Sequence, residues 1–161
     1  MPILLCRVDD RLIHGQVVVG WGSKLAIDFI AVVDDELAAS EWEQDLYRAG
    51  VPEDIEARFV GADAAADLIA EWDESPERGF VLTRDIETMV RLAERDALDR
   101  FEVNLGGLHD AQGRRRVLPY LFLSEDDRAA LESLRRTGVR VSAQDVPSAR
   151  KIGLDELLEL R

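Results

Sequence analysis

The chain has 161 residues and a mass of 18.1 kDa, which is the size of one domain with its own buried core. Hydrophobic residues make up 47% and charged residues 33% of it, so the composition excludes a disordered or a fibrous protein. The net charge is −13 and residues 114–116 form the one cluster of basic residues, which argues against nucleic acid as a partner.

The acidic residues are concentrated in one part of the chain. Residues 34–77 contain 15 aspartates and glutamates but only two arginines. We expect them to form solvated surfaces, with partners approaching the rest of the molecule. Cys6 has no second cysteine to pair with, the first residues do not resemble a signal peptide, and no apolar stretch approaches the roughly 20 residues of a membrane helix. The sequence therefore predicts a cytoplasmic protein.

Strands and helices are predicted to alternate along the chain. Residues 3–8 are short, mostly apolar and stopped by two aspartates, which is typical of a buried strand. The other expected strands cover residues 29–33, 55–60, 80–83, 102–105, 117–123, bent at Pro119, and 139–141. The expected helices cover residues 17–25, 36–49, 63–72, 86–98 and 124–138, the last with Ser124 as its N-cap. Gly106 and Gly107 are expected to form a tight turn.

This alternation predicts an α/β fold. We expect residues 1–161 to form a single three-layer domain with a mostly parallel mixed sheet and helices on both faces. Ligands of such sheets bind beyond the carboxyl ends of the strands. That rule selects four segments, which are residues 9–16, 34–35, 83–85 and 106–110.

The segment 9–16 has the composition of a reactive site, with two carboxylates, a guanidinium, an imidazole and an amide. A free imidazole has a pKa of about 6.5, so near pH 7 it is mostly neutral and able to attack phosphorus. We therefore expect His14 to be a catalytic residue that carries a phosphoryl group. Arg11 and the free N–H groups of Gly15 and Gln16, at the start of the next helix, would bind the phosphate.

Other roles of His14 remain open from its residue type alone. A histidine in a strand-to-helix loop is often an ordinary hydrogen-bonded residue. A metal site is less favoured, because His14 is the only nitrogen ligand nearby and the adjacent Asp9 and Asp10 are expected to point apart. We expect no metal and no cofactor, and we assign Asp10 a supporting role.

The loop also carries a family resemblance. Residues 7–17, Arg-Val-Asp-Asp-Arg-Leu-Ile-His-Gly-Gln-Val, with Trp21 following, closely resemble the N-terminal signature of the phosphotransferase-system IIB subunits of the mannose/fructose/sorbose family. Residues 104–107, the helix before Gly138 and, more loosely, residues 144–147 extend the resemblance over nearly the whole chain. Residues 108–116 look unlike the family.

The resemblance implies a fold and an activity. Family members have a sheet flanked by helices. His14 would take a phosphoryl group on Nδ1 from a phosphohistidine of a IIA phosphocarrier protein and pass it to a sugar held by a membrane IIC/IID permease. Arg11 would stabilise the phosphate. The chain would then be a protein-Npi-phosphohistidine–sugar phosphotransferase at the inner face of the membrane.

Two other functions use the same histidine. The chain could be a regulatory module that is phosphorylated without passing phosphate to a sugar. Histidine phosphatases and mutases also use phosphohistidine, but they place arginine directly before it, where this chain has Ile13. Outside the loop, His109 is expected at the rim of the site, with a contact to the active loop as the alternative. Residues 114–116 are expected to form a solvated turn or a partner surface.

Overall fold

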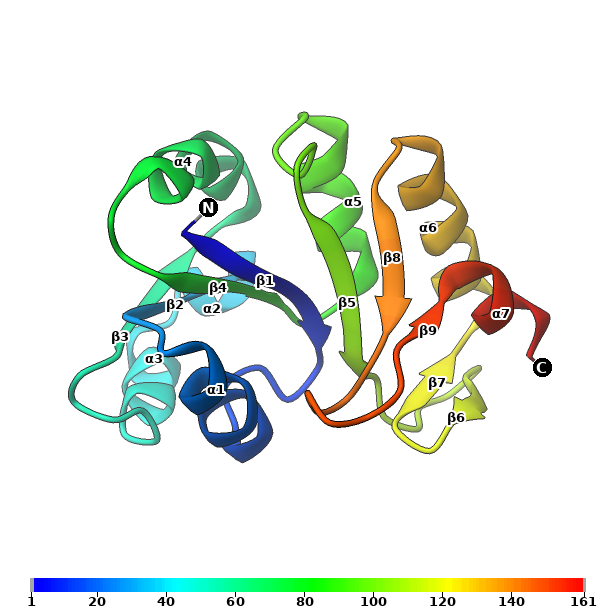
Figure 1. Cartoon of the computed structure of the whole chain (residues 1–161), viewed down its shortest axis with the longest axis horizontal. Helices are drawn as coiled ribbons and strands as arrows, with labels where there is room; N and C mark the ends of the chain where they lie inside the picture. The colour runs from blue at the N-terminus through cyan, green and yellow to red at the C-terminus, as the bar shows by residue number, and fades with distance from the viewer. Residues whose placement is uncertain (1, 161) are drawn as a thin grey trace.

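The computed structural model describes residues 2–160 and contains a seven-stranded sheet (Figure 1). The strand order is β3-β2-β4-β1-β5-β8-β9, and all neighbours are parallel except β8 and β9. Its strands are β1 (Ile3–Asp9), β2 (Phe29–Val33), β3 (Glu56–Val60), β4 (Gly79–Thr83), β5 (Glu102–Gly107), β8 (Arg140–Ala143) and β9 (Ile152–Gly153). The expected α/β fold with a mostly parallel mixed sheet is confirmed.

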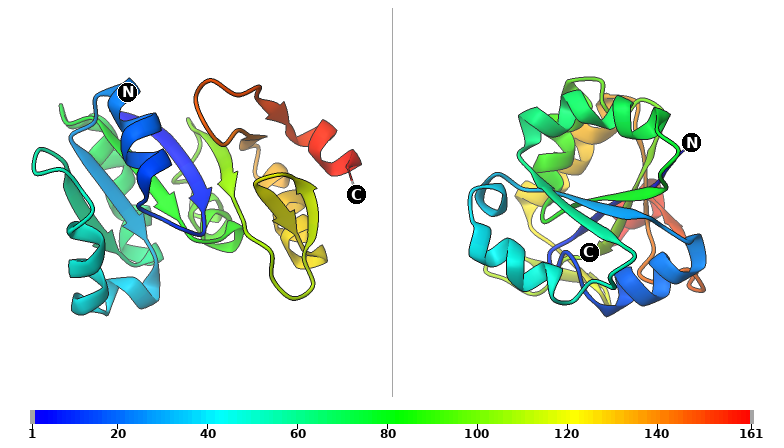
Figure 2. Two further views of the ribbon diagram at one scale, coloured as in Figure 1. Left: turned by 90° about the horizontal axis from the view of Figure 1, so that it is seen from below. Right: turned by 90° about the vertical axis from the view of Figure 1, so that its left-hand side faces the viewer.

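Helices cover both faces of the sheet (Figures 1 and 2). The helices are η1 (Gln16–Gly22), α1 (Ser23–Leu25), α2 (Asp35–Ala38), α3 (Glu41–Arg48), α4 (Ala62–Glu74), α5 (Ile86–Glu94), α6 (Glu125–Arg136) and α7 (Leu154–Glu159). Apolar residues of α4, α5, α6 and α7 form one core, and those of η1, α2 and the β1–η1 loop form a second core on the opposite face. Within residues 2–160, no helix is long and apolar enough to cross a membrane.

Most expected elements are present with bounds that differ by one or two residues, but two of the expected helices differ more. Residues 36–49 form two helices, α2 and α3, because the chain leaves the helical path at Ala39 and Ser40. The amide of Gln44 donates to the carbonyls of Leu37 and Ala38, so the polar groups at the break are paired. Helix α5 ends at Glu94 rather than residue 98, since Asp96 adopts a left-handed φ of 60° that no helix can continue through.

Three expectations about the second half were wrong. Residues 117–123 are not one strand but an antiparallel hairpin of β6 (Arg115–Leu118) and β7 (Leu121–Leu123), because the chain reverses at Pro119. The strand at residues 139–141 is not the last, since β9 and α7 follow it. Gly106 and Gly107 lie inside β5 and not in a turn. Residues 1 and 161 of the expected domain lie outside the described residues.

Candidate active site

The β1–η1 loop lies at the carboxyl edge of the sheet and is held there by its backbone. The N–H of Asp10 donates to the carbonyl of Gly107 on β5 at 3.0 Å, and the N–H of Leu12 donates to the carbonyl of Asp9 at 2.9 Å. Leu12 has a left-handed φ of 57°, which is strained for leucine, and its side chain is fully buried in the second core. Burial of Leu12 therefore fixes a tight turn directly before His14.

The imidazole of His14 is oriented by a buried carboxylate. His14 Nε2 lies 2.8 Å from Asp9 Oδ2; the His14 side chain is 17% exposed, whereas that of Asp9 is inaccessible. Burial alone would raise the pKa of Asp9, but hydrogen bonds from His14 and Arg11 and the charges of His14 and Arg7 lower that pKa to about 2. The carboxylate is therefore ionised at neutral pH and accepts a hydrogen bond from the Nε2–H group of His14. A neutral His14 then keeps its lone pair on Nδ1.

The carboxylate of Asp9 is itself held by two arginines. Arg7 donates to Oδ2 at 3.1 Å, while the backbone N–H and Nε of Arg11 donate to Oδ1 at 3.1 and 3.3 Å. Both oxygens of Asp9 are therefore occupied. This network fixes the carboxylate, and through it the ring of His14, before any substrate arrives.

Arg7 joins three strands beneath the loop. Its fully buried guanidinium donates to Asn104 Oδ1 at 2.7 Å and to the carbonyls of Gln144 and Asp145 at 3.1 and 3.0 Å. Burial lowers the pKa of Arg7, although Asp9 opposes that shift. The guanidinium lies on Gly106, where a Cβ atom would come within 1.9 Å of Arg7 Cζ, which explains why glycine stands inside β5.

Three groups close to His14 in the chain are able to bind an anion, namely the guanidinium of Arg11 and the backbone N–H groups of Gly15 and Gln16. Arg11 Nη2 donates to Gln16 Oε1 at 2.8 Å, which positions the guanidinium while its Nη1 makes no hydrogen bond within residues 2–160. The His14 carbonyl accepts the N–H groups of Val17 and Val18, both at 3.0 Å, and so begins the helical segment. The N–H groups of Gly15 and Gln16 precede that first bond and have no acceptor among the described residues.

The segment that follows is a π-helix, η1, which continues into the short α1. A helix was expected here, and the wider π-helical winding is found frequently at functional sites. Val17, Val18 and Trp21 are buried on it, and Trp21 Nε1 donates to the Asp145 carbonyl at 2.9 Å. The arrangement ties the helix to the same turn that receives Arg7.

Asp10 points away from His14 toward the loop that follows β5. It accepts the backbone N–H of His109 at 2.8 Å and contacts His109 Nδ1 at 2.5 Å, with Arg114 Nη1 3.7 Å away. Arg114 also donates to Asp127 at 3.1 Å, at the start of α6. His109 therefore contacts the β1–η1 loop, and Asp10 links that loop to His109 and Arg114.

Sequence reasoning missed the two residues that organise the loop, Arg7 and Asp9. The spacing of Arg7 and Asp9 in the sequence could have indicated that they form a pair. Residues two apart on a strand share a face, so Arg7 and Asp9 lie side by side, and two charges on one face of an otherwise apolar buried strand require each other as partners. Asp9 and Asp10 do point apart, as expected.

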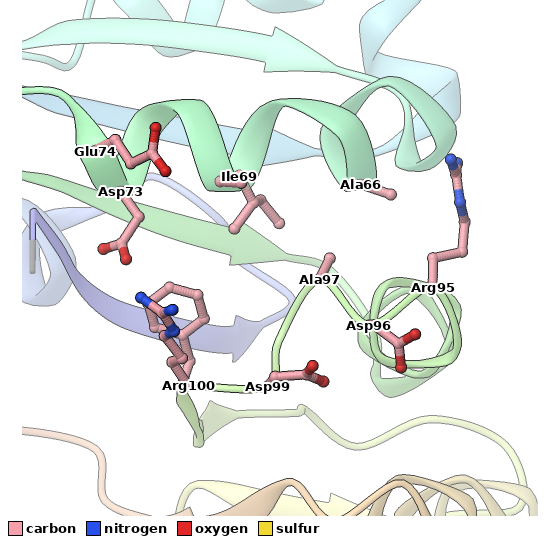
Figure 3. Close-up of a pocket in the computed structure, with 11 residues that line it drawn as sticks. Ala66, Ile69, Asp73, Glu74, Arg95, Asp96, Ala97, Asp99 and Arg100 are labelled. Atoms are coloured by element: carbon pink, nitrogen blue, oxygen red, sulfur yellow. The ribbon is translucent and has the colours of Figure 1, made fainter.

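The pocket drawn in Figure 3 lies away from the β1–η1 loop. Figure 3 shows a pocket of about 260 Å³ between α4 and residues 95–101, lined among others by Asp73, Glu74 and Arg100. It contains no residue of the β1–η1 loop. Residues 2–160 hold no group of three or more histidines, cysteines, aspartates or glutamates arranged to bind a metal ion.

Comparison with known proteins gives one consistent result. Residues 3–161 match the family described as the PTS system sorbose subfamily IIB component. The chain is 31% identical to the N-acetylgalactosamine-specific phosphotransferase enzyme IIB component 1 of Escherichia coli, over 92% of this chain and 94% of that protein. It is 30% identical to the fructose-specific EIIB component of Bacillus subtilis, over 92% and 90%. The crystal structure of the Escherichia coli protein superposes with a TM-score of 0.85 at 30% identity, covering 94% of this chain and 99% of that one.

Proposed function

Because the chain belongs to the sorbose subfamily of phosphotransferase-system IIB components, which transfer phosphoryl groups during sugar uptake, we propose that His14 is its phosphoryl carrier. The donor is a phosphohistidine of a IIA protein, and the acceptor is a hydroxyl of a sugar held by a membrane IIC/IID permease. The observation that carries the proposal is the 2.8 Å contact between His14 Nε2 and Asp9, which leaves Nδ1 as the nucleophile.

The phosphoryl group is transferred twice, first from the IIA phosphohistidine to His14 and then from His14 to the sugar. The Nδ1 lone pair of His14 forms a bond to phosphorus while the nitrogen–phosphorus bond of the donor breaks, and the donor nitrogen keeps that electron pair. In the second step a sugar hydroxyl oxygen bonds to phosphorus and the bond to Nδ1 breaks. The hydroxyl proton passes to solvent water, and His14 regains its neutral form with its own proton still on Nε2. Asp9 accepts a hydrogen bond from the Nε2–H group throughout, which keeps the ring in place.

The charge on the transferred group is stabilised by Arg11 and two amides. Arg11 offers the unbonded Nη1, and Gly15 and Gln16 offer backbone N–H groups at the start of a helix, where the positive end of its dipole adds to them. These donors are fixed before the reaction, so little reorganisation is needed when phosphate arrives. Gln16 acts mainly by holding Arg11. Asp10 acts indirectly, through the loop of His109.

We assign residues 1–161 to one IIB domain that acts as a protein-Npi-phosphohistidine–sugar phosphotransferase. It works at the inner face of the membrane through its contact with the permease. The relatives named above are specific for N-acetylgalactosamine and for fructose, which supports a sugar as the acceptor for this chain as well.

Mass analysis after incubation with a phosphorylated IIA protein tests the proposal. We expect one phosphoryl group on His14 in the unaltered protein and none in His14→Gln, which should fold normally because the His14 side chain is outside the two cores. Undiminished labelling of His14→Gln would exclude His14 as the acceptor. Vesicles bearing IIC and IID should then convert the label into sugar phosphate. Labelling without this conversion would instead identify a regulatory phosphorelay module.

A further inference from the structure

Helix α3 exposes two large apolar side chains next to each other. Trp42 is 67% exposed and Leu46 is 65% exposed, and they are among the most exposed large hydrophobic residues of the described chain. Residues four apart on a helix are neighbours on its surface, so the two side chains form one apolar surface. We call Trp42, Leu46 and the acidic residues around them the α3 patch.

The α3 patch is not needed to hold α3 on the protein. The opposite side of the helix does that, because Tyr47 packs against Phe59 with ring centroids 6.4 Å apart and Gln44 bonds the end of α2. Tryptophan is enriched at the centres of protein interfaces, where it contributes more binding energy than its neighbours. An exposed Trp42 beside Leu46 therefore indicates a contact surface for another protein.

The rim of the α3 patch is acidic. Glu41 and Asp45 are exposed next to Trp42, with which they line one shallow hollow of the surface. The basic residue on the helix, Arg48, is already engaged, since it lies 3.3 Å from Asp45 and 5.0 Å from the centre of the Phe59 ring. Charge complementarity requires a partner whose surface is basic around an apolar centre.

The α3 patch belongs to the same layer as the catalytic loop. Leu37 of α2, directly before α3, is buried in the core that also contains Leu12 and Val17. Helix α3 begins after the carboxyl end of β2, the edge of the sheet at which the β1–η1 loop lies (Figure 1). No residue of the patch contacts His14, so a partner on α3 would leave His14 free to react.

We propose that the α3 patch docks on the cytoplasmic loops of the membrane IIC/IID permease, a step that rests on the proposed function. Cytoplasmic loops of membrane proteins carry an excess of lysine and arginine, which complements the acidic rim. Anionic lipid headgroups would repel the same rim, so the protein loops and not the bilayer are its target. The patch lies within residues 34–77, the acidic segment that the sequence led us to expect to be free of partners.

Vesicle binding tests the docking without requiring phosphoryl transfer. Inverted vesicles bearing IIC and IID are compared with vesicles of the same lipids without them. We expect the unaltered protein to bind only the former, and binding to weaken as salt rises. The double substitution Trp42→Ala and Leu46→Ser should weaken binding at least tenfold, and so should Glu41→Lys with Asp45→Lys.

A matched control changes the same charge elsewhere. Glu53 and Asp54 are exposed and precede β3 at the amino edge of the sheet, so Glu53→Lys with Asp54→Lys should bind the permease vesicles as the unaltered protein does. All variants should retain His14 labelling by the phosphorylated IIA protein at the unaltered rate, which also shows that they fold.

Several results would overturn the docking. One is undiminished binding of both patch variants to the permease vesicles; another is equal binding of the unaltered protein to vesicles that lack IIC and IID. A dimer in sedimentation that the patch substitutions abolish, or a raised KM of the patch variants for the IIA donor, would also contradict the docking. Undiminished vesicle binding by the patch variants would leave the proposed function intact as long as His14 is labelled. Conversely, an unlabelled His14 together with patch-dependent binding to the permease vesicles would refute the carrier role alone.

Discussion

At the scale of residues, the proposed reaction depends on which nitrogen of His14 carries the proton, and a neighbour five positions earlier in the chain selects that nitrogen. Asp9 accepts a hydrogen bond from Nε2, and the pKa of Asp9 near 2 excludes a protonated carboxyl at physiological pH. The identity of the nucleophile therefore depends on the charge of Asp9 as well as on its position. Replacement of Asp9 by asparagine, which has nearly the same shape but no charge, separates the effect of the charge from that of the position.

We predict that Asp9→Asn reduces phosphorylation of His14 about 100-fold or more. An asparagine amide can donate to Nε2, which moves the ring proton to Nδ1 and removes the lone pair that attacks phosphorus; the equivalent change in a serine protease costs about 10⁴. Nitrogen NMR of the imidazole should show the altered tautomer, and timed labelling should show the loss. Asp10→Asn is the matched control, and it should leave the tautomer unchanged because Asp10 contacts His109 instead.

The phosphate-binding roles of Arg11 and Gly15 stay predictions; they could be inferred from the sequence because a positive charge and a glycine lie within three residues of His14. Arg7 could not be assigned in the same way. Its partners Asn104, Gln144 and Asp145 are 97 or more positions away, and only the parallel pairing of β1 with β5 and of β5 with β8 brings them together. The role of Gly106 depends on Arg7, so it was mistaken for a turn glycine for the same reason.

At the scale of elements, strands were easier to predict than the ends of helices. Strands β2 and β4 are buried on both faces, which produces continuous apolar runs. The division between α2 and α3 has no proline or glycine to mark it, since it lies at Ala39 and Ser40, where the chain leaves the helical conformation. Hairpin β6–β7 could not be separated from one bent strand, because Pro119 is compatible with both.

The β1–η1 loop depends on one leucine for its shape. Leu12 holds a left-handed φ of 57° and is fully buried in the second core. The strain of that backbone conformation costs on the order of 1 kcal/mol, and burial of the side chain outweighs it. The loop therefore keeps its turn only while the leucine stays anchored.

We predict that Leu12→Ala lowers the free energy of unfolding by about 3 kcal/mol and also slows labelling of His14 several-fold. Loss of the buried side chain leaves a cavity and frees the strained turn to relax, which displaces His14 from Asp9. Urea unfolding and timed labelling measure the two effects. Leu12→Met conserves the volume and should recover most of both. A full labelling rate in a destabilised Leu12→Ala protein would show that the loop is held without this anchor.

At the scale of the whole molecule, the sheet divides the protein into two apolar cores and one polar network crosses its carboxyl edge. Arg7 and Asp9 stand in the middle strand, β1, and contact β5 and the turn after β8. The buried charges are thus part of the packing between the two halves of the sheet. Protonation of Asp9 removes one of them, so the stability of the entire domain is linked to pH through this carboxyl.

We predict that Asp9 makes the domain lose roughly 2 kcal/mol of unfolding free energy between pH 5 and pH 2. The pKa of Asp9 is lowered from 3.8 to about 2, each unit corresponds to about 1.36 kcal/mol, and a lowered carboxyl pKa stabilises the fold above the unfolded value. That stabilisation is present at pH 5 and is lost as pH falls toward the pKa of Asp9 in the folded protein.

Urea unfolding should show this loss in the unaltered protein and in Asp10→Asn. Asp9→Asn should be less stable at pH 5, since the buried guanidinium of Arg7 loses its negatively charged partner, and it should lack this part of the decline. An equal decline in Asp9→Asn would mean that other carboxyls carry the acid sensitivity and that Asp9 titrates alike in the folded and unfolded chains.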